Sequence, residues 1–281
     1  MPIRFDRKNG SLAEIDIDLG GKNTFDITGM NELIKIFEGN IEKEIELKAI
    51  LIKSSNPDYF ATGPEIKEIA GLDRDGARYY VTVLNVMCRH IAESPVPVIC
   101  SVKGAVSGIG LDIVSSCDFR LAEKKSFFAD LSSKYGIMSP SNSVLRLAFL
   151  IGAQKAKEII LTSKNYTAEE LYKFNYFTEI FGAEDFDGGT AKFFKDFTAL
   201  STDSLRLKKR IFIDLWKNYL KNNQFSSGEI FSELLKEGKD WKKSVSDFNG
   251  HSLYLHNAVL KHFFIFPLTT ILEYSIFRIY T

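Results

Sequence analysis

Only three cysteines occur among the 281 residues, and the basic and acidic side chains cancel in charge. Cys88, Cys100 and Cys117 are an odd number and lie in apolar segments, so we expect buried, reduced thiols in a cytoplasmic protein. The net charge of zero provides no strong basic surface for a nucleic acid or an anionic membrane. The HExxH, CxxC and Walker lysine motifs are also missing, so neither a metal nor a redox cofactor is expected.

Long hydrophobic runs are missing too, although the last residues come near to one. A membrane-spanning helix needs about 20 continuous apolar residues, and the run near the C-terminus has only about ten. Lys261, His262, Glu273 and Arg278 flank or interrupt it. We expect no membrane span, and we predict that the apolar tail, residues 251–281, packs on the protein body or on a neighbouring subunit. An interfacial or poorly ordered tail is the alternative.

The most informative stretch lies in the middle of the chain. Residues 98–102 form a short apolar run rich in β-branched side chains, which predicts a buried strand. Gly104, Gly108 and Gly110 follow, and an apolar pattern typical of a helix starts at Leu111. This order brings backbone N–H groups to a helix N-terminus, where they can stabilise a developing negative charge. A tight strand-to-helix turn without a chemical role has the same spacing, so both interpretations stay open.

Strands alternate with helices through the first half of the chain, which predicts an α/β fold with a mostly parallel sheet. A turn at Asn9-Gly10 should join the first two strands, and the expected strands are 3–5, 12–17, 49–53, 98–102, 119–122 and 127–128. Asp26 or Thr28 is a candidate cap for an amphipathic helix. From about residue 143 the chain turns helical, with a capping box at Thr167 and Glu170.

Five blocks of sequence occur in an order that resembles the crotonase (enoyl-CoA hydratase/isomerase) superfamily over roughly residues 1–250. The blocks are 23–26, 49–52 with 59–67, 97–120, 134–137 and 166–170. The resemblance implies a crotonase-like spiral of ββα units, with a crotonase core at 1–195 and a helical C-terminal trimerisation region at 196–250. It also implies an acyl-CoA thioester substrate, a homotrimer or a dimer of trimers, and no cofactor apart from the coenzyme A carried by the substrate.

The shared device of this family is an oxyanion hole, in which two N–H donors hold the thioester carbonyl as it becomes enolate-like. The resemblance places the two donors at Pro64 and Ile109. Proline has no N–H group, so either Gly63 or Glu65 supplies a displaced donor or Ile109 acts alone. A further possibility is that Pro64 simply begins a helix in a protein that has lost thioester chemistry.

Hydratases of this family use two glutamates to add water across a double bond. The first position matches Asp112, a carboxylate one methylene shorter, and the second matches Ser132, which cannot act as a carboxylate base. Asp130 is the nearest substitute, because residues two apart in an extended strand share a face. Asp112 is also a residue type that the helix dipole favours at a helix start, so its catalytic role stays open.

Further positions extend the expected site. Lys22, Ile66 and Lys67 match regions that contact the adenine and phosphates of coenzyme A in relatives. Lys134 and Tyr135 stand in a segment similar to that of decarboxylating crotonases, which also lack the second glutamate. A surface lysine and a buried tyrosine are the plainer interpretation of these two residues.

The sequence therefore predicts an acyl-CoA or acyl-carrier thioester enzyme of the hydratase/isomerase type that works through an enolate. A crotonase-type decarboxylase of a polyketide-like pathway and a catalytically inactive binding or assembly protein are the alternatives. His90 lies near the region where related dehalogenases carry a histidine, but its offset differs, so we expect a structural histidine.

Overall fold

The computed structural model describes residues 2–222 and 227–250, and the predicted apolar tail at 251–281 lies outside the described residues. Strands β1 (Ile3–Lys8) and β2 (Leu12–Ile17) pair antiparallel around a turn. Asn9 and Gly10 both have positive φ there, at 51° and 70°. Asparagine and glycine tolerate this left-handed conformation better than other residues, and the predicted hairpin is confirmed.

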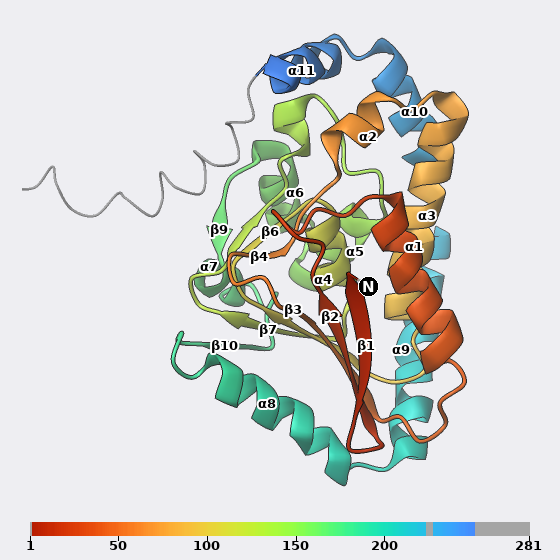
Figure 1. The fold of residues 1–281 in the computed structure, drawn as a ribbon, viewed down its shortest axis with the longest axis vertical. Helices are drawn as coiled ribbons and strands as arrows, with labels where there is room; N and C mark the ends of the chain where they lie inside the picture. Colours follow the sequence, from red (N-terminus) through yellow and green to blue (C-terminus); the bar gives the residue numbers. More distant parts are fainter. Residues whose placement is uncertain (1, 223–226, 251–281) are drawn as a thin grey trace, which may run out of the picture.

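The larger sheet continues from β2 with strands that all run parallel to one another. Its order is β1-β2-β3-β5-β7-β10 (Figure 1). The added strands are β3 (Ala49–Ser54), β5 (Val98–Val102), β7 (Phe119–Glu123) and β10 (Glu179–Phe181). Strands β3, β5 and β7 start where the sequence predicted strands, because their apolar, β-branched runs suit a buried parallel sheet.

A smaller sheet has the order β4-β6-β8-β9, in which β4, β6 and β8 run parallel and β9 runs antiparallel. Its strands are β4 (Tyr59–Ala61), β6 (Ala105–Ser107), β8 (Phe127–Ala129) and β9 (Tyr166–Thr167). Each of the first three follows a strand of the larger sheet and leads towards a helix, which is the predicted ββα repeat. Because β4, β6 and β8 are parallel neighbours, the residues that follow them meet at one end of the small sheet.

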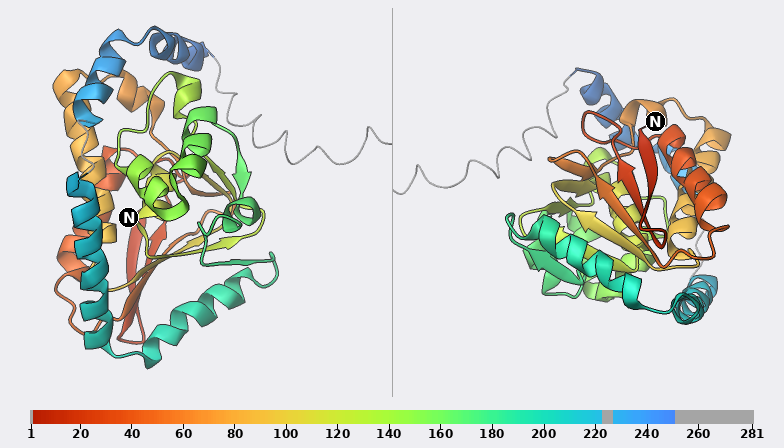
Figure 2. Two further views of the ribbon diagram at one scale, coloured as in Figure 1. Left: turned by 180° about the vertical axis from the view of Figure 1, so that it is seen from behind. Right: turned by 60° about the horizontal axis from the view of Figure 1, so that its bottom comes forward.

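The two faces of the larger sheet carry separate cores. Successive residues of a strand point to opposite faces, and Leu51 and Ile99 accordingly pack with Phe194 and Phe197 on one side. The other face belongs to the main core, which includes much of α1 (Ile27–Ile36) and α3 (Arg74–Ala92). Figure 2 shows α8 (Phe186–Asp196) on the face of the sheet opposite to α1.

Side-chain caps define where several helices begin. Asp26 accepts a hydrogen bond from Gly29 N at 2.7 Å at the start of α1, so Asp26 and not Thr28 is the cap. The predicted capping box is present at α7 (Ala168–Tyr172), where Thr167 and Glu170 each bond the other's backbone. Helix α2 (Ile66–Ala70) begins two residues after Pro64. The interpretation that Pro64 begins a helix is therefore wrong.

The C-terminal part of the chain is helical, as predicted. Helices α5 (Ser143–Ile151) and α6 (Ala153–Thr162) lead into it, and α9 (Thr202–Asn222), α10 (Ser227–Glu237) and α11 (Lys239–Gly250) follow α8. Helix α10 packs on α3, and α11 lies against α2 (Figures 1 and 2). None of the helices in 2–222 and 227–250 combines the length and apolar character needed to cross a bilayer.

The three cysteines are buried free thiols, as expected from their apolar surroundings. Burial raises the pKa of Cys88 to about 12, because a thiolate loses its hydration inside the core. Burial also raises the pKa of Cys117, so neither Cys88 nor Cys117 offers a reactive thiolate at neutral pH.

Candidate functional site

A cavity of about 300 Å³ opens where the turns after β4, β6 and β8 meet. Residues 62–66 follow β4, residues 107–109 begin at the last residue of β6, and residues 130–132 follow β8, and all three segments line it. The loop at 137–140 and side chains of α3 and α10 complete the wall. Parallel strand ends are a common place for ligand sites in α/β proteins.

Two glycines press the start of helix α4 (Ile109–Ser116) against the turn after β4. A Cβ at Gly108 would lie 1.8 Å from the carbonyl oxygen of Gly63, and a Cβ at Gly110 would lie 2.0 Å from that of Ala61. Gly108 also has a φ of 52°, which favours glycine. The glycine-rich turn therefore lies directly against the backbone of the turn after β4.

This contact brings Pro64 and Ile109, the two positions expected for oxyanion donors, to the same cavity. The first N–H groups of a helix have no partner within the helix. In α4 the first helical bond runs from Asp112 N to Gly108 O at 3.1 Å, so the Ile109 N–H belongs to the unbonded first turn. Pro64 also lines the cavity, and as a proline it has no N–H to donate there.

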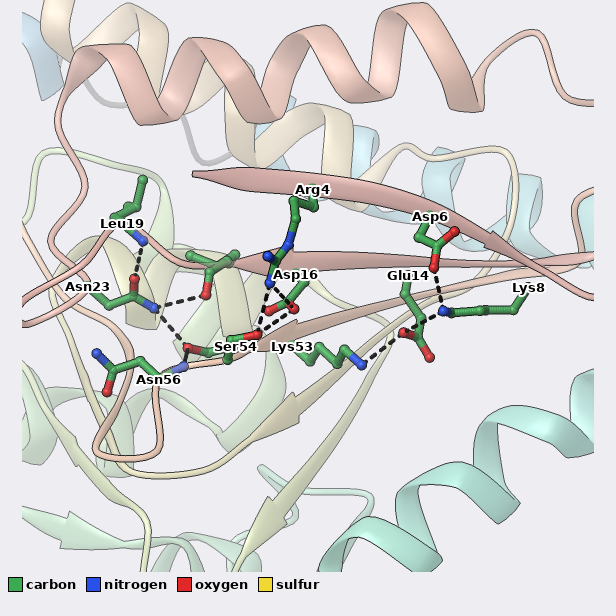
Figure 3. Close-up of polar contacts among 12 residues, drawn as sticks. Arg4, Asp6, Lys8, Glu14, Asp16, Leu19, Asn23, Lys53, Ser54 and Asn56 are labelled. Carbon is green, nitrogen blue, oxygen red and sulfur yellow. Dashed lines mark hydrogen bonds and ion pairs between the residues drawn. The ribbon is translucent and has the colours of Figure 1, made fainter. Parts of the chain in front are cut away.

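A buried asparagine fixes the segment that packs beside the turn after β4. Asn23 accepts a bond from Leu19 N at 2.7 Å and donates to Ser54 Oγ at 2.9 Å (Figure 3). This fixes the chain just before Thr24, which forms an isolated bridge with Thr62 and a hydroxyl contact at 3.0 Å. The block at 23–26 thus positions the turn after β4 and does not itself carry an acid or base at the cavity.

Asp112 lies in the first turn of α4, is 2% exposed and lines the cavity. Its Oδ1 accepts a hydrogen bond from Ser141 Oγ at 2.5 Å. The predicted location at a helix start is confirmed. A carboxylate buried at a helix N-terminus and bonded by a hydroxyl is a strong candidate for proton transfer.

Asp130 is a second buried carboxyl group at the same cavity, with 3% of its surface exposed. Its Oδ1 accepts bonds from Ser132 N at 2.9 Å and from Ser132 Oγ. Burial raises the pKa of Asp130, and the two bonds from Ser132 oppose that rise. The chain turns at Leu131 (φ −95°, ψ 1°), so the expected extended strand through 130–132 is wrong, although both residues do line one cavity.

The remaining wall is largely apolar. Tyr80 and Leu84 of α3 meet Phe231 of α10 there. The Tyr80 and Phe231 rings stack with centroids 6.2 Å apart, and Phe231 is fully buried. A cavity lined by two carboxyl groups and by several apolar side chains suits a ligand with an apolar chain and a reactive polar group.

The three residues expected to contact coenzyme A are not equivalent. Lys22 and Ile66 line the cavity, whereas Lys67 is exposed on α2 and does not. Lys134 is exposed, and Tyr135 is half-buried in the cavity wall, where burial raises its pKa. His90 lies elsewhere, within 3.3 Å of Glu38 and Glu42. The structural interpretation of His90 is thus confirmed.

The sequence pattern of the enoyl-CoA hydratase/isomerase family matches residues 7–254. The chain belongs to this family. It is 26% identical over 172 residues to the "Probable enoyl-CoA hydratase 2, mitochondrial" of Arabidopsis thaliana, covering 60% of this chain and 57% of that protein. It is 28% identical over 167 residues to the "Short-chain-enoyl-CoA hydratase" of Clostridium acetobutylicum, covering 58% of this chain and 62% of that protein. The matched part thus spans less than two thirds of these family members.

Solved structures of the family share the fold. An enoyl-CoA hydratase/isomerase from Xanthobacter autotrophicus Py2 has a TM-score of 0.80 at 18% identity, covering 95% of this chain and 99% of that one. An enoyl-CoA hydratase from Bacillus halodurans has a TM-score of 0.79 at 20% identity, covering 88% and 100%. The predicted crotonase membership and fold are therefore confirmed.

Among the residues that escaped the sequence reasoning, Tyr80 of α3 and Phe231 of α10 line the cavity. Ser141, in a loop, contacts the cavity residue Asp112. No local motif marks them, because their roles depend on contacts between segments far apart in the chain.

Proposed function

We propose that this protein is an acyl-CoA enzyme of the hydratase/isomerase type that forms an enolate in the cavity. The observation that carries the proposal is the meeting of two nearly fully buried aspartates, Asp112 and Asp130, with the N-terminus of α4 in one cavity. A thioester carbonyl beside Ile109 would have its developing charge next to an N–H donor and the positive end of a helix dipole.

For hydration, the Asp112 carboxylate takes a proton from water as the water oxygen bonds to the β-carbon of the enoyl group. The π electrons move to the α-carbon and the carbonyl oxygen, and the Ile109 N–H holds the resulting enolate. Asp130, whose pKa is raised by burial, then gives its proton to the α-carbon. Proton exchange with solvent returns Asp112 and Asp130 to their starting states.

The missing N–H at Pro64 predicts a slow hydratase for a simple enoyl thioester. Loss of one donor of an oxyanion hole costs about 100- to 1,000-fold in rate. We therefore expect crotonyl-CoA hydration well below the limit of about 10⁸ M⁻¹s⁻¹ reached by the most efficient enzymes. Substrates whose enolate is more stable tolerate this loss better.

The coenzyme A part of the substrate is proposed to leave the cavity past Lys22 and Ile66, which line it. A lysine ammonium and an aliphatic side chain suit a phosphate and an adenine. Lys67, which is exposed on the same short helix as Ile66, would contact only a part of the ligand that lies in solvent.

Self-association is proposed through α9, as a trimer or a dimer of trimers. Leu207, Ile211, Phe212 and Leu215 are each more than half exposed, whereas Trp216 of the same helix is buried. A contiguous exposed apolar patch of this kind marks an interaction surface. Light scattering should give a multiple of three subunits, and the double change Ile211→Glu with Leu215→Glu should give smaller species.

Arg210→Glu, at an exposed position beside that patch on α9, is the matched control and should keep the assembly. A wild-type protein that stays monomeric at micromolar concentration would contradict the proposed assembly.

Calorimetry and turnover with a small panel of thioesters test the function. Coenzyme A, butyryl-CoA, crotonyl-CoA and malonyl-CoA should each bind, and crotonyl-CoA should lose its enoyl absorbance slowly. Release of carbon dioxide from malonyl-CoA without crotonyl-CoA hydration would instead indicate a decarboxylase. Binding without any turnover would indicate an inactive binding protein, and no binding at millimolar concentration would contradict the proposal.

A further inference from the structure

The loop at 136–142 connects the Asp130 side of the cavity to the Asp112 side. Its first residue, Gly136, has a φ of 66°, and a Cβ there would lie 2.6 Å from the backbone nitrogen of Trp241 in α11. At its other end, Asn142 N donates to Asn85 Oδ1 of α3 at 3.1 Å. Both ends of the loop therefore contact helices that are far away from it in the sequence.

Ser141 stands directly before the second anchor. It is 1% exposed, and its hydroxyl donates to Asp112 Oδ1 at 2.5 Å. A donor of this kind favours the ionised carboxylate and fixes one of its oxygens, which leaves the other oxygen with a defined direction. Both anchors of the loop serve to keep this donor in place.

We propose that Ser141 is a positioning residue that holds the Asp112 carboxylate ionised and oriented for proton transfer, with the loop at 136–142 as its support. The catalytic meaning of this inference rests on the proposed function. The contact itself does not, so it can be tested on the protein without any substrate.

Other groups also face Asp112 and must be held constant in the test. Tyr80 and Cys88 of α3 and Arg146 of α5 interact electrostatically with its carboxylate. Arg146 is a buried guanidinium stacked over Trp216 at 4.5 Å, so it contributes a fixed positive charge. A change at Ser141 leaves all three groups in place, so a shift in the protonation midpoint of Asp112 then reports the loss of the Ser141 hydroxyl.

The experiment follows the carboxyl ¹³C signal of Asp112 through a pH titration of the full chain labelled at aspartate. Asp112→Asn identifies the signal by its disappearance. In Ser141→Ala the protonation midpoint should move up by about one to two pH units, because a hydrogen bond to a charged group is lost. Ser141→Cys, which keeps the size and offers a weaker donor, should give a smaller shift in the same direction.

Ser133→Ala removes an exposed serine hydroxyl of the neighbouring turn and should leave the midpoint unchanged. Thermal unfolding of each variant shows whether the fold is kept, and Ser141→Cys decides the matter if Ser141→Ala does not fold. An unchanged midpoint in the folded Ser141 variants would overturn the inference. If the midpoint shifts but no thioester is bound or turned over, Ser141 still holds Asp112 and the proposed function fails separately.

Discussion

The two carboxyl groups of the cavity are held in different ways. Asp112 depends on distant parts of the chain, since Gly108 and Gly110 set α4 against the turn after β4 and Ser141 donates from 29 residues away. Asp130 is held by Ser132, two residues along the same turn. The Asp112 side should therefore respond to changes throughout the tertiary structure, whereas the Asp130 side should respond mainly to local ones.

The largest expected effect is on the Asp112 side. Asp112→Asn keeps the shape of the side chain but cannot take a proton, so crotonyl-CoA turnover should fall by about 100- to 10,000-fold. The measurement is loss of enoyl absorbance on purified protein, with circular dichroism to show that the fold is kept. If turnover survives this change, Asp130 and not Asp112 is the base, and the larger effect on turnover is expected on the Asp130 side.

Asp130→Asn should lower turnover less, and it should also change how stability depends on pH. Burial raises the pKa of Asp130 in the folded protein, so the folded state keeps a proton that the unfolded state loses above about pH 4. The free energy of unfolding of the wild type therefore falls as pH rises from there through the raised folded pKa. The asparagine variant lacks this decline.

Urea unfolding at several pH values measures this difference. The stability of wild type relative to Asp130→Asn should decrease with rising pH across that window. A difference that is constant with pH would mean that the pKa of Asp130 is the same in the folded and unfolded states, with the two bonds from Ser132 offsetting its burial.

The smallest effect is expected for Ser132→Ala. This change removes the Ser132 hydroxyl from Asp130 but leaves the backbone Ser132 N–H bond at 2.9 Å. Its effect on turnover should thus be weaker than that of Ser141→Ala on the Asp112 side. Equal losses from the two serine variants, measured side by side in the same assay, would remove the distinction between a distant and a local support.

The sequence was informative where a local pattern fixes the backbone. The apolar run at 98–102 and the glycines that follow it predicted the strand and the strand-to-helix turn, although α4 begins at Ile109 and not at Leu111. Pro64 and Ile109 were matched to one site, and they do line one cavity. The family likeness added the ββα order, which periodicity alone does not specify.

The sequence was less informative where the structure depends on turns and on distant contacts. The turn at Leu131 replaced an expected extended strand, because the Asp130 side chain bonds the backbone two residues on and favours a turn. Ser141 reaches Asp112, and Phe231 reaches the cavity, only through the packing of a loop and of α10. Spacing within a segment carries no signal for such contacts.

The most direct test of the proposed enolate is exchange of the α-protons of butyryl-CoA in deuterated water, followed by mass spectrometry. This substrate can be neither hydrated nor decarboxylated, so exchange reports proton removal and enolate stabilisation alone. The account predicts exchange by the wild type that is lost in Asp130→Asn, because Asp130 is the group that exchanges a proton with the α-carbon. Bound butyryl-CoA that keeps its α-protons in the wild-type protein would contradict it.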